Sequence, residues 1–209
     1  MGYSGWQLVS LKALAFASSL DKKVLRQTLL QQRQALSAQD WTEKSQAICE
    51  HIAQAEWFQK AETVLAYLSV RQEPDLSALW TRNSASKGWG LPRCAGTTLA
   101  WHQYNPGLSG QLQPGAYGIL EPLSALPAVE PDAVDLILVP ALACDRRGFR
   151  FGYGGGFYDR LLAQPEWANK PTIGIVFELA FLDHLDADPW DCPMQAVCTE
   201  NALYSSKNP

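Results

Sequence analysis

The residues of this chain that are best suited to ligand binding or catalysis lie together in its C-terminal half. An apolar run ends at Asp145, and a basic turn that contains Arg146, Arg147 and Arg150 follows it. Beyond this turn the chain places four glycines close together, at Gly152, Gly154, Gly155 and Gly156. Because glycine has no Cβ atom, successive backbone N–H groups can surround phosphate oxygens there, and the N-terminus of a following helix favours the same anion. The pattern therefore predicts a nucleoside triphosphate site, with Asp145 and Asp159 as carboxylates that could hold a metal ion.

Glycine-rich turns also occur without any ligand, and other nucleotide sites use them too. A P-loop is absent, since no Gly-Lys-Ser or Gly-Lys-Thr follows the glycines. A dinucleotide site is a competitor, because Glu178 ends an apolar run about 20 residues after Gly156. In that fold, however, the apolar strand leads directly into the first glycine, whereas the basic turn intervenes here. An NAD-dependent oxidoreductase therefore stays as an alternative to an ATP-using enzyme.

Apolar patterns along the chain alternate between helical and extended spacing. We expect helices over residues 21–36, 38–60 and 75–87, and strands over 63–70, 88–92, 99–104, 136–142, 172–177 and 196–199. Such alternation predicts an α/β protein with a three-layer Rossmann-like fold, in which helices cover both faces of a mostly parallel central sheet. Ligands of such sheets bind beyond the carboxyl ends of strands, where Glu73, Asp145 and Glu178 fall. Residues 105–133, rich in Gly and Pro, predict a loop that serves as a functional flap.

Composition and charge narrow the class of protein. The net charge of −4 and the scattered Lys and Arg residues argue against a nucleic-acid-binding protein. Five cysteines without a C-x-x-C pair, and three histidines, give no spacing for a zinc site and fit a reducing cytoplasm. No apolar run is long enough to span a membrane. We therefore expect a cytoplasmic protein that acts on small molecules, as a monomer with an oligomer as the alternative.

The length of the chain fits one domain with short additions. We expect that domain over residues 21–203, an N-terminal extension over residues 1–20 and a C-terminal tail over residues 204–209. The extension carries Ala15-Phe16-Ala17, which is similar to the cleavage site of a secretory signal. Lys12 interrupts its apolar stretch and no basic residues precede it, so a secretory signal is not the preferred interpretation.

The glycine segment also resembles that of a known family. Residues 139–162, VPALACDRRGFRFGYGGGFYDRLL, are similar to the signature of the 5-formyltetrahydrofolate cyclo-ligase family, also called 5,10-methenyltetrahydrofolate synthetases. The chain departs from that signature at Cys144, Phe151 and Phe157, where the family usually has Phe, Leu and Tyr. Further elements of the family follow at Lys22 and Arg26, at residues 66–73, at Leu91-Pro92-Arg93, at residues 118–122 and at Trp190-Asp191. The resemblance thus covers about residues 21–201.

The resemblance implies an enzyme that uses ATP and Mg²⁺ to cyclise 5-formyltetrahydrofolate to 5,10-methenyltetrahydrofolate, with release of ADP and phosphate. An amide-like formyl oxygen is a poor leaving group, and its phosphorylation would give a reactive iminium phosphate that the neighbouring folate nitrogen attacks. The protein would mainly position the reactants and neutralise phosphate charge. A non-catalytic folate- or nucleotide-binding protein on the same scaffold stays as the first alternative.

The resemblance also implies roles for individual residues. The residues expected to bind ATP are Lys22, Arg26, Arg150, Gly152, Tyr153, Gly154, Gly155, Gly156, Phe157 and Tyr158. Of these, Arg150 and Tyr158 are also expected to act catalytically beside the formyl group. Leu68, Glu73 and Tyr117 would contact the folate, with the Glu73 carboxylate accepting hydrogen bonds from the pterin. Asp159 and Asp191 would bind Mg²⁺, Asp145 would support the glycines, and Arg160 is left outside the site.

Overall fold

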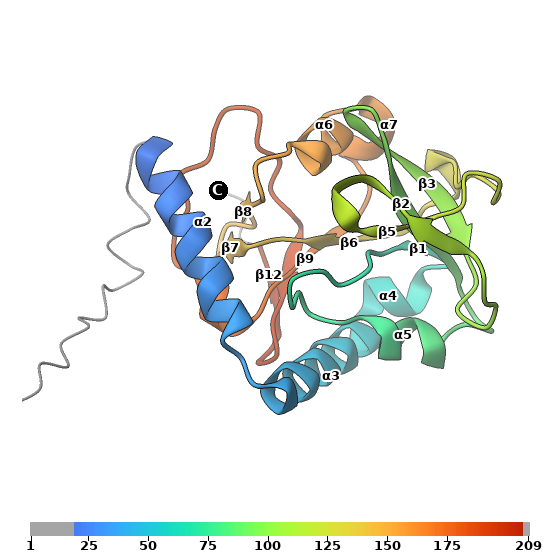
Figure 1. Ribbon diagram of the computed structural model, residues 1–209, viewed down its shortest axis with the longest axis horizontal. Helices are drawn as coiled ribbons and strands as arrows, with labels where there is room; N and C mark the ends of the chain where they lie inside the picture. Colours follow the sequence, from blue (N-terminus) through green and yellow to red (C-terminus); the bar gives the residue numbers. More distant parts are fainter. Residues whose placement is uncertain (1–18, 207–209) are drawn as a thin grey trace, which may run out of the picture.

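A seven-stranded sheet forms the centre of the protein (Figure 1). The computed structural model describes residues 19–206, and its main sheet has the strand order β12-β11-β9-β6-β1-β2-β3. The five strands from β11 to β2 run parallel, and an antiparallel strand lies at each edge. The strands are β1 (Thr63–Leu65), β2 (Gly88–Ala95), β3 (Thr98–Tyr104), β6 (Leu136–Pro140), β9 (Thr172–Ile175), β11 (Ala196–Cys198) and β12 (Leu203–Ser205). The prediction of a mostly parallel central sheet is confirmed.

Helices cover both faces of this sheet, which confirms the three-layer prediction (Figure 1). The helices are α2 (Ser19–Gln34), α3 (Ala38–Gln54), α4 (Glu56–Lys60), α5 (Ser77–Arg82), α6 (Phe157–Leu162) and α7 (Pro165–Ala168). In β6, Leu136 and Leu138 pack into the core with α3, α4 and α5, whereas Ile137 and Val139 pack into the core with α6 and α7. Successive residues of a strand point to opposite faces of a sheet, so β6 is covered from both sides.

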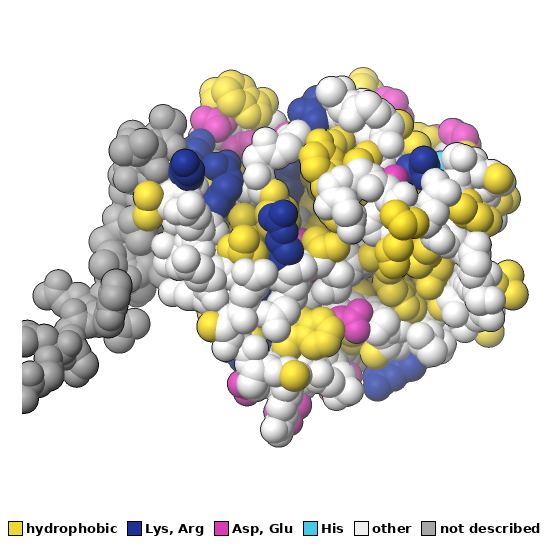
Figure 2. All heavy atoms as spheres, in the orientation of Figure 1, with side chains coloured by type: hydrophobic (Ala, Val, Ile, Leu, Met, Phe, Trp, Pro, Cys, Tyr) yellow, Lys and Arg dark blue, Asp and Glu magenta, His cyan; other side chains and the backbone are white. Residues whose placement is uncertain are grey.

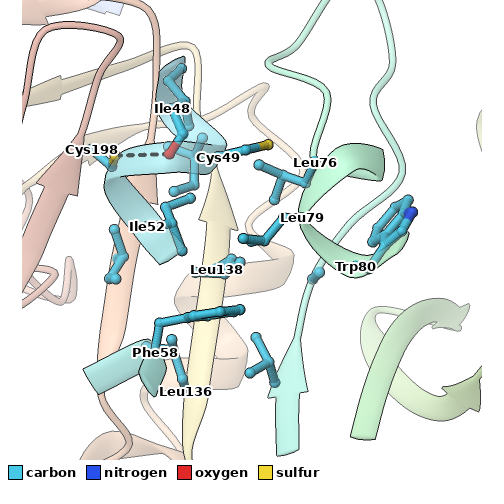
Figure 3. Packing of buried hydrophobic residues seen from close by; sticks show 14 of the residues in the cluster. Ile48, Cys49, Ile52, Phe58, Leu76, Leu79, Trp80, Leu136, Leu138 and Cys198 are labelled. Atoms are coloured by element: carbon cyan, nitrogen blue, oxygen red, sulfur yellow. Dashed lines mark hydrogen bonds between the residues drawn. The ribbon is translucent and has the colours of Figure 1, made fainter. Parts of the chain in front are cut away.

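The core beneath α3 is built from residues one helical turn apart (Figure 3). Ile48 and Ile52 are fully buried and belong to the same cluster as Leu138. α3 begins after Ser37, whose Oγ accepts a hydrogen bond from the backbone N of Asp40 at 3.0 Å. Such a cap satisfies one of the free N–H groups at the start of a helix. Each fully buried Ile or Leu contributes about 1.5–3 kcal/mol, so this face anchors the sheet that carries the ligand-binding edge.

A second, three-stranded sheet carries the chain into the glycines. Its strands, in the order β10-β7-β8, are β10 (Phe181–Leu182), β7 (Ala143–Asp145) and β8 (Arg150–Phe151). The predicted strand 136–142 therefore ends early, at Pro140, and its continuation belongs to this smaller sheet. Leu25 and Leu29 of α2 pack against it in a separate apolar cluster. The residues that lead into the glycines are thus held between α2 and the main sheet.

The predicted flap over residues 105–133 contains regular structure that sequence analysis did not predict. β4 (Leu112–Pro114) and β5 (Leu120–Pro122) form an antiparallel hairpin, with short 3₁₀ turns at η1 (Ala116–Gly118) and η2 (Pro131–Ala133). The strands are only three residues long and contain prolines, which hides them in a pattern rich in Gly and Pro. A third 3₁₀ turn, η3 (Glu178–Ala180), follows β9.

The predicted helix over residues 38–60 is wrong in one respect, because the structure divides it into α3 and α4. The break lies at Ala55, whose backbone is extended (φ −67, ψ 132). Nothing in the local sequence indicates the break, since alanine is the best helix former. The redirected chain places Phe58 in the core, where it is 2% exposed. Tertiary packing therefore outweighs helix propensity here.

Two further elements are shorter than predicted. The strand expected over residues 63–70 ends at Leu65, and the chain then runs towards the ligand-binding edge in irregular form. The helix expected over residues 75–87 covers only α5. At its C-terminus the side chain of Asn83 donates a hydrogen bond to the carbonyl of Leu79 at 2.7 Å. Side chains of this kind compete for helix hydrogen bonds and favour an early end.

The ends of the described chain differ in part from the expected boundaries. α2 begins at Ser19, so residues 1–18 of the expected extension, like residues 207–209 of the expected tail, lie outside the described residues. β12 follows the predicted strand 196–199 and pairs antiparallel with β11. β12 is only three residues long, which is too short for its hydrophobic pattern to predict a strand. Within residues 19–206, no helix has the length and apolar character needed to cross a membrane.

Candidate active site

A cavity of about 920 Å³ is lined by residues of α2, the glycine segment and the β4–β5 hairpin. Figure 2 shows this face of the molecule, hollowed between α2 and the hairpin, with Lys and Arg side chains gathered along the hollow. Every residue that the family resemblance assigned to ATP, folate or Mg²⁺ lines the cavity: Lys22, Arg26, Leu68, Glu73, Tyr117, Arg150, Gly152, Tyr153, Gly154, Gly155, Gly156, Phe157, Tyr158, Asp159 and Asp191. The structure brings all of them together, while their individual roles stay predictions.

The glycine loop, residues 152–156, forms one wall of the cavity. Two arginines from different helices hold its carbonyl groups. Arg26 of α2 donates from Nε to the carbonyl of Gly152 at 3.1 Å. Arg160 of α6 donates from Nη2 to the carbonyl of Gly155 at 2.7 Å. Arg160 does not itself line the cavity, so it supports the loop from outside.

A buried carboxylate fixes the turn that precedes the glycine loop. Asp145 is fully buried and accepts hydrogen bonds from Nε and Nη2 of Arg147 at 2.9 and 2.8 Å. It also accepts hydrogen bonds from the backbone N–H groups of Arg147, Phe149 and Leu185. Asp145 is not among the residues that line the cavity. This geometry agrees with the expectation that Asp145 supports the glycine segment, because its two oxygens are directed to these partners and not to the cavity.

The pair of Arg150 and Tyr158 presents buried polar atoms that lack a protein partner. Nη2 of Arg150 donates to Oδ1 of Asp159, but among the described residues its Nη1 and the hydroxyl of Tyr158 have no hydrogen-bond partner. Burial raises the pKa of Tyr158 well above its ordinary value, so this hydroxyl stays protonated and can donate. An unpaired buried donor costs free energy, and a phosphate or formyl oxygen in the cavity would offset that cost.

Three carboxylates lie beside the cation-rich wall. Oδ2 of Asp191 accepts a hydrogen bond from the backbone N of Asp188 at 2.8 Å, and the Asp188 side chain forms an ion pair with Lys22 at 2.8 Å. Burial raises the pKa of Asp191, and the charges of Asp159 and Asp188 raise it further. A cation between Asp159 and Asp191 would relieve this repulsion.

The donor set fits Mg²⁺ that is held jointly by protein and phosphate. Among the described residues there is no group of three or more His, Cys, Asp or Glu side chains arranged to hold a metal ion. Mg²⁺ is commonly bound by one or two carboxylates, with phosphate oxygens and water as the other ligands. Asp159 and Asp191 supply that number of carboxylates.

Glu73 also lines the cavity and is 2% exposed. Arg71 and Gln72 have positive φ angles of 48° and 57°, and this tight turn directs Glu73 inward. Its Oε2 accepts a hydrogen bond from the backbone N of Val70 at 3.1 Å, and its Oε1 accepts one from the hydroxyl of Tyr153 at 2.5 Å. Burial raises the pKa of Glu73, although the hydrogen bond from Tyr153 opposes this effect.

The β4–β5 hairpin closes the cavity with an aromatic side chain. Tyr117 at its turn is 75% exposed, and its ring centroid lies 6.1 Å from that of Phe157, the first residue of α6. Leu68 also lines the cavity. The buried Glu121 holds the hairpin to β2 by accepting a hydrogen bond from the backbone N of Cys94 at 3.2 Å. Sequence analysis did not assign Glu121 a role, although its element, residues 118–122, was noted.

Glu178 does not lie at the cavity, contrary to the expectation that it falls at the ligand-binding edge. Its Oε2 accepts a hydrogen bond from Oγ1 of Thr199 at 2.6 Å, and its backbone N donates to Oε2 of Glu200 at 2.7 Å. The side chain is instead directed from η3 towards Thr199, the residue that follows β11. The acidic residue that a dinucleotide site requires is therefore not beside the glycine loop, which argues against the NAD-dependent alternative.

Comparisons with known proteins agree with the geometry. A family model described as the 5-formyltetrahydrofolate cyclo-ligase family matches residues 18–200. Two similar relatives are named 5-formyltetrahydrofolate cyclo-ligase: one from Mycolicibacterium smegmatis, 34% identical over 87% of this chain and 95% of the relative, and one from Haemophilus influenzae, 30% identical over 80% and 86%. The solved 5,10-methenyltetrahydrofolate synthetase of Aquifex aeolicus has a TM-score of 0.79 and 29% identity, over 90% of this chain and 94% of that one.

The buried hydrogen bonds of Asp145 predict a large loss of stability in Asp145→Asn. Asparagine cannot accept at both positions or pair with Arg147, so we expect the free energy of unfolding to fall by about 3 kcal/mol. Denaturant-induced unfolding followed by circular dichroism would measure it. Asp183→Asn is the matched control, because Asp183 forms an exposed ion pair with Arg146, the residue that follows Asp145 in the chain. Its effect should stay within about 0.5 kcal/mol, and equal effects in the two variants would contradict the assignment.

Proposed function

The chain belongs to the 5-formyltetrahydrofolate cyclo-ligase family, and from this we propose that its cavity binds ATP and 5-formyltetrahydrofolate side by side and joins the formyl carbon to the neighbouring folate nitrogen. One observation carries the proposal: a single cavity holds both a basic, glycine-lined wall and a buried carboxylate suited to a pterin. A volume of about 920 Å³ lies near the upper end for small-molecule sites and can accommodate two ligands.

The triphosphate would lie along the basic wall. Lys22, Arg26 and Arg150 all line this part of the cavity, and their charges would neutralise the phosphate oxygens. Arg26 already contacts the glycine loop and lies over the ring of Phe151 at 4.7 Å. Its guanidinium is thus held in place before a nucleotide arrives. Asp159 and Asp191 would hold Mg²⁺, which when bound neutralises charge on the phosphate oxygens.

The pterin would lie towards Glu73. The pterin amino group and ring N–H form a donor edge, and an ionised carboxylate accepts from such an edge with strong, charge-assisted hydrogen bonds. Leu68 and Tyr117 supply apolar and aromatic surface on the way to the glycine loop. This orientation would direct the formyl group towards Arg150 and Tyr158, each of which has a buried donor without a partner in the described part of the chain.

The reaction that we propose has two steps. The formyl oxygen first attacks the γ-phosphorus, so that a new O–P bond forms while the bond to ADP breaks. The neighbouring folate nitrogen then attacks the formyl carbon, loses its proton, and phosphate departs with the C–O bond electrons. The protonated hydroxyl of Tyr158 would donate to the reacting oxygen, and Arg150 would stabilise charge on the transferred phosphoryl group.

The proposal predicts that the methenyl product forms only when 5-formyltetrahydrofolate, ATP and Mg²⁺ are all present. The near-ultraviolet absorbance of the product measures its formation. Asp159→Asn removes a metal ligand and the partner of Arg150, so we expect a rate at least about 100-fold lower. Asp132→Asn, at an exposed residue outside the cavity, should keep the rate. Absence of product with intact ATP and folate binding would favour the non-catalytic alternative, and a normal rate in Asp159→Asn would remove Asp159 from the metal site.

The raised pKa of Glu73 predicts a pH dependence of folate affinity. Burial favours the protonated form, so the carboxylate accepts from the pterin above its raised pKa and loses that ability as the pH falls through it. We expect the dissociation constant for 5-formyltetrahydrofolate to rise in that window, at a higher pH than for an exposed glutamate. Glu73→Gln should weaken folate binding roughly 10- to 100-fold at neutral pH and flatten the profile, while ATP affinity stays nearly constant. Titration calorimetry across pH measures both, and an unchanged profile would remove Glu73 from the pterin site.

A further inference from the structure

Three segments of the chain meet at the hydroxyl of Tyr153. Arg33, in the last turn of α2, is 4% exposed and donates from Nη2 to this hydroxyl. Its Nε donates to the carbonyl of Arg71 at 3.1 Å. The hydroxyl in turn donates to Oε1 of Glu73 at 2.5 Å. One phenol therefore connects α2, the turn that presents Glu73, and the glycine loop.

The Tyr153 hydroxyl competes with the pterin for Glu73. Oε2 of Glu73 already accepts from the backbone N of Val70, and Oε1 accepts from Tyr153. Both Glu73 and Tyr153 line the cavity. An ionised carboxylate has lone pairs for about four hydrogen bonds, and two of these positions are already taken, so a ligand that places two donors against Glu73 competes with the hydroxyl for Oε1.

We propose that Tyr153 is a displaceable placeholder for the pterin and that Arg33 is the positioning residue that holds it, so that folate binding shifts the glycine loop and strengthens ATP binding. The inference rests on the proposed function and deepens it. Tyr153 acts through the glycine loop, because it lies between Gly152 and Gly154 in the chain. Gly154 has a φ of 94°. Glycines on both sides let the backbone change conformation at low cost.

The displacement of Tyr153 affects the basic wall of the cavity through Arg26. Nε of Arg26 donates to the carbonyl of Gly152, next to Tyr153 in the chain, and its guanidinium lies close to Gly154. When Tyr153 moves, the carbonyl that occupies Arg26 moves with it. The released guanidinium then gains a free N–H for a phosphate oxygen, which makes a charge-assisted hydrogen bond in place of a neutral one.

Arg33 keeps the displaced tyrosine within reach. The guanidinium groups of Arg33 and Arg71 lie 5.6 and 5.8 Å from the centroid of the Tyr153 ring. Nη1 of Arg33 is buried and has no partner among the described residues, so it offers the hydroxyl oxygen a second position when Glu73 is taken. Because coupling between two ligands is reciprocal, ATP must then strengthen folate binding by the same factor.

Calorimetric titration of 5-formyltetrahydrofolate, with and without a saturating non-hydrolysable ATP analogue and Mg²⁺, tests the inference. For the natural protein we expect folate affinity to rise 5- to 150-fold with the nucleotide. Tyr153→Phe removes the competing hydroxyl and leaves Oε1 of Glu73 without that donor. Folate alone should then bind roughly fivefold more tightly, and the effect of the nucleotide should fall towards none.

Two further variants separate this coupling from a structural role. Tyr204→Phe is the matched control, because its hydroxyl lies 3.5 Å from Glu178, outside the cavity, and both affinities should stay unchanged. Arg33→Lys keeps the charge but not the fork of donors, and it should reduce the coupling factor without abolishing folate binding. A loss of folding in Arg33→Lys would not affect the result with Tyr153→Phe, in which only one oxygen is removed.

The outcomes distinguish this inference from the function on which it rests. A natural protein that cyclises 5-formyltetrahydrofolate, together with a Tyr153→Phe variant of unchanged folate affinity and unchanged coupling, overturns the placeholder role alone. The same holds if the nucleotide has no effect on folate affinity in an active natural protein. A natural protein that binds no 5-formyltetrahydrofolate overturns both.

Discussion

The buried carboxylate of Asp145 is the constraint on which the active-site architecture depends. It joins β7 to the basic turn through Arg147 and to the later segment of the chain through the backbone N–H of Leu185. The glycine loop follows the first connection, and the segment that carries Asp188 and Asp191 follows the second. One group with no exposure to solvent thus sets the distance between the basic wall and the acidic residues. A charge in that position is tolerated because Arg147 and the backbone donors surround it.

The cavity combines firmly held and unsatisfied groups. Arg26, Arg160 and Glu121 hold the loop and hairpin through hydrogen bonds to the backbone. Arg150 and Tyr158, in contrast, keep buried donors that have no partner within residues 19–206. Such donors are costly in the free protein and become favourable only when a ligand oxygen arrives. Preorganised donors of this kind stabilise developing charge without rearrangement during the reaction.

Much of the fold and the candidate site could be predicted because the informative residues are local in sequence. The glycines, Arg150 and Asp159 lie within one short segment, and the alternation of helices and strands indicated the layered sheet. Prediction failed where distant contacts decide the structure. The break at Ala55 depends on the burial of Phe58, and the strands of the small sheet are too short to show a period.

The same limit explains the two residues that sequence analysis misplaced or missed. Glu178 has the spacing of a dinucleotide ligand, but its hydrogen bond with Thr199 directs it away from the cavity. From the sequence, Arg33 is an ordinary basic residue in the last turn of a helix. Its contact with Tyr153 becomes evident only in the folded structure. The resemblance to the cyclo-ligase family gave the roles expected of the other site residues, since it covers nearly the whole chain, but it assigned none to Arg33 or Glu178.

The antiparallel edge strands of the main sheet also bear on self-association. At one edge, residues 127–129 pair with β3, with Gln103 donating to the carbonyl of Pro127 and Val129 donating to that of Trp101, both at 2.8 Å. At the other edge, β12 is only three residues long. Exposed strand edges are templates for aggregation, and natural sheets cover or shorten them. The parallel interior of the sheet is therefore shielded from edge-to-edge pairing with neighbouring copies of the chain.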